Sequence, residues 1–119
     1  MILTCAHLSP VEQEALDVFV RRLHAHHSSN VRQVVLFGSR ARGDFDPDSD
    51  VDILVQLSDD DPSLQSEVRR LGARVSLEYD LLLSIRAGGR SQWERMARYR
   101  SHLYRALQAE GIALSPLVA

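Results

Sequence analysis

The sequence of 119 residues contains a single cysteine, Cys5, and no lysine. One cysteine cannot form an intrachain disulfide or, by itself, a cysteine metal site, so a reducing, cytoplasmic setting is predicted. Every mechanism that needs a lysine amine is excluded, because all 14 basic residues are arginine. No apolar run approaches the roughly 18 residues that a membrane span requires. The first residues also lack the basic and apolar regions of a signal peptide.

The length and composition are typical of one small globular domain, expected to occupy residues 1–119. Apolar residues make up 45% and charged residues 25%, and the net charge is −2. The charges are unevenly distributed, since half of the 16 acidic residues lie between Asp44 and Asp61. Arginines concentrate in the C-terminal part of the chain. The acidic stretch is therefore the first place to look for a site.

Hydrophobic periodicity predicts the order helix, strand, strand, helix, strand, helix. The expected elements are a helix from Pro10 to His26–Ser29, strands at Val34–Phe37 and Asp50–Val55, a helix at Pro62–Val75, a strand at Tyr79–Ile85 and a helix from Ser91 to Glu110. Ser9 with Glu12, and Ser91 with Glu94, have the spacing of helix-capping boxes. This order predicts an α/β fold, in which helices pack on a sheet of three or more strands.

The residues most suited to chemistry follow the first predicted strand. Gly38 and Ser39 come directly after the apolar run, where glycine lets a ligand approach the backbone and free N–H groups can bind an anion. Ten residues later, Asp50 and Asp52 stand at positions i and i+2 of a strand, on one face about 7 Å apart. Two such carboxylates repel each other unless a cation lies between them. A phosphate-binding turn beside metal-binding carboxylates is what nucleotidyl transfer requires.

A site with two metal ions usually has a third carboxylate, for which Asp80 is the best candidate. It lies within the predicted strand at Tyr79–Ile85, where an unpaired acid among apolar residues would be costly. An adjacent strand would place Asp80 beside Asp50 and Asp52. Glu78 is the second choice for this third position.

Other interpretations of this stretch explain only some of its residues. Asp44, Asp46 and Asp48 fit a solvated acidic loop better than a metal site. A calcium-binding loop is not supported, since Ser49 and Val55 stand where the motif needs glycine and glutamate. A P-loop is excluded, because Asp44-Phe45 replaces the lysine and hydroxyl residue after Gly43. Arg40 and Arg42 fit phosphate binding and pairing with the acidic loop equally well.

At these residues the sequence resembles the minimal nucleotidyltransferase (MNT) domains of the DNA polymerase β superfamily. The similarity includes Gly38-Ser39, the ten-residue spacing to Asp50-Val51-Asp52, and the flanking Arg40-Ala41-Arg42-Gly43 and Ser49. It covers about residues 10–114, which would form the core of the domain. The resemblance implies a small polymerase β-like fold with a mixed sheet.

The resemblance also implies roles for individual residues. Gly38, Ser39, Arg40 and Arg42 would bind the nucleotide, and Asp50 and Asp52 would ligate Mg²⁺, two ions being expected. Asp80 would complete the metal site and could accept the proton of the acceptor hydroxyl.

A lone domain of this type is similar to the antitoxin of MNT–HEPN toxin–antitoxin pairs. The implied function is transfer of AMP from ATP to a tyrosine hydroxyl of a HEPN ribonuclease toxin, within a stable hetero-oligomer. Neither a membrane nor a nucleic acid is expected as a partner. Two alternatives stay open: an inactive antitoxin that neutralises its partner by occlusion, and a small-molecule nucleotidyltransferase that needs a separate helical subunit.

Overall fold

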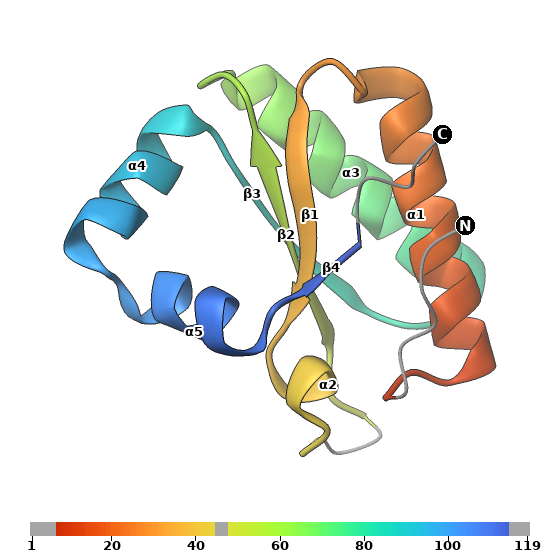
Figure 1. Ribbon diagram of the computed structural model, residues 1–119. Helices are drawn as coiled ribbons and strands as arrows, with labels where there is room; N and C mark the ends of the chain where they lie inside the picture. Colours follow the sequence, from red (N-terminus) through yellow and green to blue (C-terminus); the bar gives the residue numbers. More distant parts are fainter. Residues whose placement is uncertain (1–6, 45–47, 115–119) are drawn as a thin grey trace.

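The computed structural model describes residues 7–44 and 48–114, which form strands and helices around one mixed sheet (Figure 1). The strands are β1 (Val31–Phe37), β2 (Val51–Leu57), β3 (Leu83–Gly88) and β4 (Ile112–Ala113). The helices are α1 (Pro10–His27), α2 (Ser39–Arg42), α3 (Pro62–Tyr79), α4 (Arg90–Tyr99) and α5 (His102–Glu110). The expected α/β class and mixed sheet are confirmed. None of the helices in residues 7–44 and 48–114 has the length and apolar character to span a membrane.

The strands lie in the order β3-β2-β1-β4. Strand β1 runs antiparallel to β2 and to β4, whereas β2 and β3 are parallel and are connected through α3. The register places Asp52 of β2 opposite Phe37 on one side and opposite Ser84 on the other. These three residues therefore lie side by side near one end of strands β1, β2 and β3.

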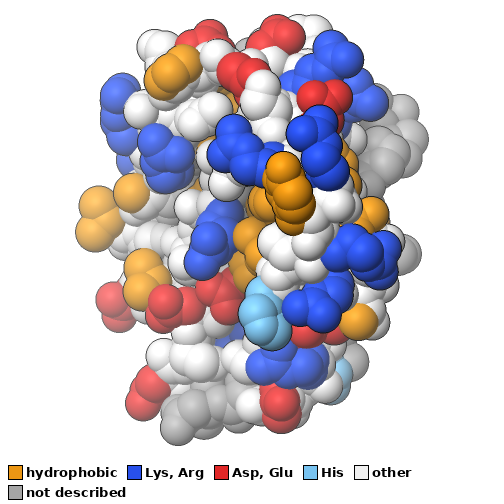
Figure 2. Space-filling view, turned by 90° about the vertical axis from the view of Figure 1, so that its left-hand side faces the viewer, with side chains coloured by type: hydrophobic (Ala, Val, Ile, Leu, Met, Phe, Trp, Pro, Cys, Tyr) orange, Lys and Arg blue, Asp and Glu red, His pale blue; other side chains and the backbone are white. Residues whose placement is uncertain are grey.

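Helices cover both faces of the sheet, as Figure 1 shows. One face packs against α1 and α3, and its buried side chains include Val34, Leu36, Val51, Ile53, Val55, Leu57 and Leu83. The opposite face packs against α4 and α5 through a smaller cluster of Val35, Phe37, Leu54, Trp93, Met96, Leu103 and Leu107. Figure 2 views the molecule from the α4–α5 side, where arginine side chains surround a few exposed hydrophobic ones. Asp52 belongs to this second face because it alternates with Ile53 along β2.

The start of the first helix agrees with its prediction, and the last helix differs. Ser9 and Glu12 form a reciprocal capping box at the start of α1. The single helix expected from Ser91 to Glu110 is wrong, because Arg100 adopts the left-handed conformation (φ 46°) and separates α4 from α5. Ser101 then caps α5 by accepting a hydrogen bond from the Tyr104 N–H. The predicted cap at Ser91 is also wrong, since its N–H donates to Asp60 and Gly89 precedes the helix.

The strand predicted at Tyr79–Ile85 is wrong in its first half. Helix α3 continues to Tyr79, Asp80 ends it in the left-handed conformation (φ 51°), and β3 begins at Leu83. Gly72 lies in the middle of α3, where an added Cβ would be 2.3 Å from Cγ1 of Ile85. The glycine lets the helix pack closely on β3. In the part of α3 beyond Val75, the Ser76 hydroxyl donates to the Gly72 carbonyl at 2.8 Å and accepts from the Leu83 N–H at 3.0 Å, which joins the longer helix to the start of β3.

Candidate active site

The turn after β1 is shaped by two glycines. Gly38 has φ 78° and ψ −160°, which disfavours any other residue, and Gly43 ends the short helix α2 with φ 91°. A Cβ added at Gly38 would lie 2.5 Å from Oδ2 of Asp52. The backbone of the turn therefore lies directly against the Asp52 carboxylate. The Gly38 turn and the Asp52 carboxylate, which the sequence spacing had suggested as parts of one site, are therefore close in space.

Asp50 and Asp52 form a pair of carboxylates without direct partners among the described residues. Asp50 is exposed just before β2, and Asp52 is half-buried within it. Neither side chain has a hydrogen bond or ion pair with residues 7–44 or 48–114. Burial and, secondarily, the charge of Asp50 raise the pKa of Asp52 above its usual value. Such a pair is stabilised by a bound cation.

Two arginines partly offset the negative charge of this pair. The charges of Arg86 and Arg42 both act to lower the pKa of Asp52. Arg86 lies on β3, two residues after Ser84, and therefore on the same face of the sheet as Asp52. Sequence analysis missed both Ser84 and Arg86 because it placed this strand too early. The alternation of polar Ser84 and Arg86 with apolar Leu83 and Ile85 was the signal that could have identified them.

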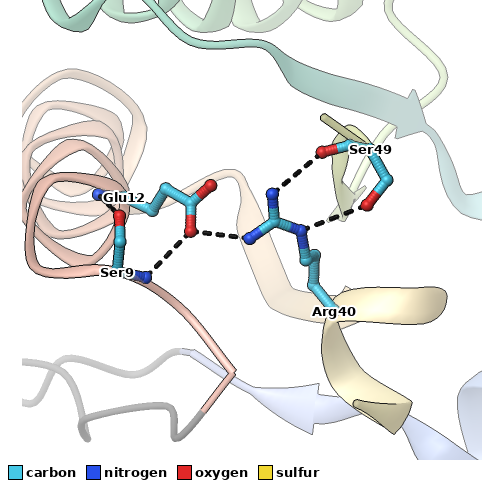
Figure 3. A network of polar contacts seen from close by, with 4 residues as sticks. All are labelled: Ser9, Glu12, Arg40 and Ser49. Carbon is cyan, nitrogen blue, oxygen red and sulfur yellow. Dashed lines mark hydrogen bonds and ion pairs between the residues drawn. The ribbon is translucent and has the colours of Figure 1, made fainter. Parts of the chain in front are cut away.

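Arg40, predicted to bind the nucleotide or to pair with acids, is engaged in a buried network (Figure 3). Its side chain is only 3% exposed and forms a 2.6 Å ion pair with Glu12 of α1. It also donates to the hydroxyl and the backbone carbonyl of Ser49, at 3.3 Å and 3.1 Å. Arg40 thus connects α1, the turn and the segment before Asp50. Positioning the loop is the role that these contacts support.

Arg42 is half-exposed and pairs with Asp44 at 3.0 Å and with Glu110 at 2.8 Å. The hydrogen bonds to Asp44 and then to Glu110 raise its pKa. The pairing expected with the acidic loop is therefore present at Asp44. The proposed contact of Arg42 with phosphate stays a prediction, and its proximity to Asp52 is consistent with it.

The two candidates for the third carboxylate lie elsewhere in the fold. Asp80 is not within a strand but at the C-terminus of α3, where it lines a groove with Arg69 and Leu77. Glu78 forms a bidentate ion pair with Arg22, with distances of 3.0 Å and 2.9 Å. Within the described part of the chain, no three acidic, histidine or cysteine side chains form a metal-binding group. The catalytic role of Asp80 stays a prediction, but its predicted place in the sheet is wrong.

The comparisons with known proteins agree with this geometry. The nucleotidyltransferase domain family matches residues 16–104 of the chain. "Putative protein adenylyltransferase MJ0141" of Methanocaldococcus jannaschii is 46% identical over 54 residues. That match spans 44% of this chain and about half, 54%, of the relative.

Solved structures show the same architecture. "Structure of putative minimal nucleotidyltransferase" matches with a TM-score of 0.58 and 25% identity, and the match covers 92% of this chain and 99% of the other. "Crystal structure of the toxin-antitoxin with AMP-PNP" matches with a TM-score of 0.53 and 19% identity, over 86% of this chain and 74% of the other. The glycine turn, the adjacent carboxylates and the family match over most of the chain lead to one conclusion. This chain belongs to the nucleotidyltransferase domain family and has the minimal nucleotidyltransferase fold.

Proposed function

We propose that this chain is a cytoplasmic, Mg²⁺-dependent enzyme that transfers AMP from ATP to a hydroxyl of a partner protein. The observation that carries the proposal is the pair Asp50 and Asp52 beside the Gly38 backbone, with no ion pair from residues 7–44 or 48–114 to either carboxylate. A half-buried acid beside a second acid, with no ion-pair partner for either, costs stability. A cation bound between the two carboxylates would offset this cost.

The two carboxylates fit magnesium. Mg²⁺ prefers oxygen ligands and is usually held by one or two carboxylates together with water and substrate phosphates. The raised pKa of Asp52, caused by burial and by Asp50, indicates that added positive charge would be favourable there. When bound, the metal would neutralise the triphosphate and stabilise charge at the reacting phosphorus.

The residues of the chain would orient the nucleotide around this pair. Gly38 leaves room for a phosphate against the backbone, and the Ser39 hydroxyl can donate a hydrogen bond to it. Arg86 and Arg42 supply positive charge from β3 and α2 that can stabilise the leaving pyrophosphate. Asp50 and Asp52 would hold the metal ion. The oxygen of the acceptor hydroxyl would bond to the α-phosphorus as the bond to the leaving pyrophosphate breaks, and the hydroxyl proton would pass to solvent.

The proposed acceptor is a HEPN-type toxin bound in a stable hetero-oligomer. The name of the relative MJ0141, a protein adenylyltransferase, supports a protein acceptor. The similarity to a toxin–antitoxin complex with AMP-PNP supports a nucleotide substrate and a protein partner. The resemblance to MNT antitoxins supports the HEPN class and an acceptor tyrosine.

The test is intact-mass spectrometry of the partner that co-purifies with the chain from its own host. Asp52→Asn removes one metal-binding charge, and Asp59→Asn is the matched control, since Asp59 is exposed in the loop after β2. We expect a partner heavier by AMP units with wild type and with Asp59→Asn. With Asp52→Asn we expect AMP transfer to fall by about a thousandfold or more, equivalent to about 4 kcal/mol.

A second function, neutralisation by binding alone, is favoured by one observation. Ser84, which is not an acid, lies opposite Asp52 on β3, and Asp80 is outside the sheet. A partner that binds wild type and Asp52→Asn equally well, with unaltered mass in both complexes, would support occlusion. The same result would refute AMP transfer.

A further inference from the structure

The outer edge of β3 is open. Strand β3 is at one end of the sheet, and its inner edge pairs with β2. Among residues 7–44 and 48–114, no strand lies along its other edge. An edge strand presents unpaired N–H and C=O groups, which can pair with a strand from another chain. Strand β3 contains neither proline nor lysine, two residues that commonly protect such edges.

An apolar groove of about 680 Å³ accompanies this edge, between β3 and the C-terminal half of α3. Leu77 and Leu82 line it and are 83% and 57% exposed. They are two of only four large hydrophobic residues exposed in the described part of the chain, the others being Val11 and Tyr99. Clustered leucines beside an open strand edge mark a protein interface.

The groove carries one charge of each sign, at opposite ends. Helix α3 runs antiparallel to β3, because it connects two parallel strands, and Gly72 of α3 lies against Ile85. Asp80 therefore lies near the start of β3. Arg69 precedes Gly72 by almost one helical turn and lies toward the end of β3. Their separation of eleven positions in the sequence corresponds to about 16 Å along a helix. Neither charge forms an ion pair within residues 7–44 and 48–114.

We propose that a second copy of this chain covers the groove, with the two β3 strands paired antiparallel about a two-fold axis. In a two-fold symmetric interface, a contact between one residue of the first copy and another residue of the second copy is repeated with the copies exchanged. Antiparallel pairing brings the Asp80 end of each groove to the Arg69 end of the other, so two ion pairs form. The exposed leucines are buried at the same time. The charge arrangement is thus complementary to itself, which selects a second copy over an unrelated partner.

The strand sequence is compatible with this pairing. With the axis at Ile85, Leu83 faces Ala87 of the other copy and Ser84 faces Arg86, so no like charges stand opposite each other. The two sheets join into one continuous sheet. Asp52 lies on the face opposite α3, so both carboxylate pairs stay accessible. The proposal is independent of the proposed AMP transfer.

The first test is sedimentation equilibrium of the full chain across a range of concentrations. We expect a reversible dimer, with its dissociation constant raised at least tenfold by Leu77→Glu and by Leu82→Glu. Val11→Glu is the matched control, since Val11 is similarly exposed (51%) on α1. A wild-type chain that stays monomeric at every concentration would overturn the proposal. Equal weakening by the Val11 control would overturn it too.

The second test is a charge exchange read by the same measurement. Arg69→Glu alone and Asp80→Lys alone each place two like charges in contact and should weaken the dimer. The double variant restores opposite charges and should recover most of the lost affinity. Because the two residues are about 16 Å apart within one chain, such recovery requires contact between copies. If the loss of dimer affinity in the double variant equals the sum of the losses in the two single variants, the pairing is refuted. Circular dichroism checks that each variant is folded.

Discussion

The two faces of the sheet are packed very differently. On the α1–α3 side, Leu36, Ile53 and Val55 are completely buried. On the α4–α5 side, Val35, Phe37 and Leu54 keep between 5% and 9% exposure, and α4 contributes no buried residue. The first face supplies most of the hydrophobic stabilisation. The second face can therefore hold half-buried Asp52, which a closely packed core would not tolerate without a partner.

The largest effect should come from matched truncations on β2. Ile53 and Leu54 are adjacent, but they face opposite sides of the sheet. We expect Ile53→Ala to lower the free energy of unfolding by about 3–4 kcal/mol and Leu54→Ala by about 2 kcal/mol. Urea denaturation measures both values. Equal losses would mean that the α4–α5 layer contributes as much as the α1–α3 layer.

The buried Arg40–Glu12 pair should have the next largest effect, since it connects the stable α1 layer to the turn of the active site. Arg40→Met leaves Glu12 without its partner, which should cost about 3 kcal/mol. Adding Glu12→Gln should recover part of that loss, because no buried charge then remains unpaired. If the double variant is no more stable than Arg40→Met, the ion pair is not the source of the effect.

The same pair predicts a pH dependence. Burial raises the pKa of Glu12, but hydrogen bonds from Arg40 and from the Ser9 N–H outweigh it, so the pKa lies below its ordinary 4.5. The pair therefore contributes fully above pH 4.5, and its contribution is lost as the pH falls through the lowered pKa. Acid titration of unfolding should show a smaller decline below pH 4.5 in the double variant than in wild type.

Glycine substitutions can separate backbone strain from damage to the site. Gly38→Ala and Gly43→Ala both put a side chain at positive φ, which should cost about 1–2 kcal/mol each. Only at Gly38 does the new Cβ meet Asp52, since at Gly43 it meets His7. Thermal stabilisation by Mg-ATP should be lost in Gly38→Ala and retained in Gly43→Ala. Loss in both variants would indicate a general distortion of the turn.

The smallest effect on stability, and a clear effect on function, is expected at Arg86. Its charge acts on Asp52 without supporting the core, so Arg86→Gln should change the free energy of unfolding by less than about 0.5 kcal/mol. The proposed AMP transfer should fall about tenfold through weaker phosphate binding. Arg98→Gln on exposed α4 is the control. An Arg86→Gln variant with unchanged transfer would remove Arg86 from the site.

The sequence by itself determined the elements whose signals are local. The capping box at Ser9 and the strands on either side of the Gly38 turn depend on neighbouring residues, and the sequence predicted them. Strand β2 begins at Val51, however, so Asp50 precedes the strand in which it was predicted to lie. The proximity of Gly38 to Asp52 could also be expected. Gly38 follows the end of one strand, and Asp52 lies near the start of the next, so both lie at the same end of the sheet when the two strands pair antiparallel. The fold class and the centre of the candidate site were therefore predictable.

Tertiary structure alone decided the remainder. Pairing of β3 with β2 places Ser84 opposite Asp52 and Arg86 on the same face, while α3 continues through Tyr79 and leaves Asp80 outside the sheet. The short strand β4 exists only because Ile112 and Ala113 find a partner in β1, which no pattern of two residues can indicate. Arg40 is buried because Glu12, 28 positions earlier, lies against it. In each case the deciding contact joins residues that are distant in sequence, and local propensity carries no information about such contacts.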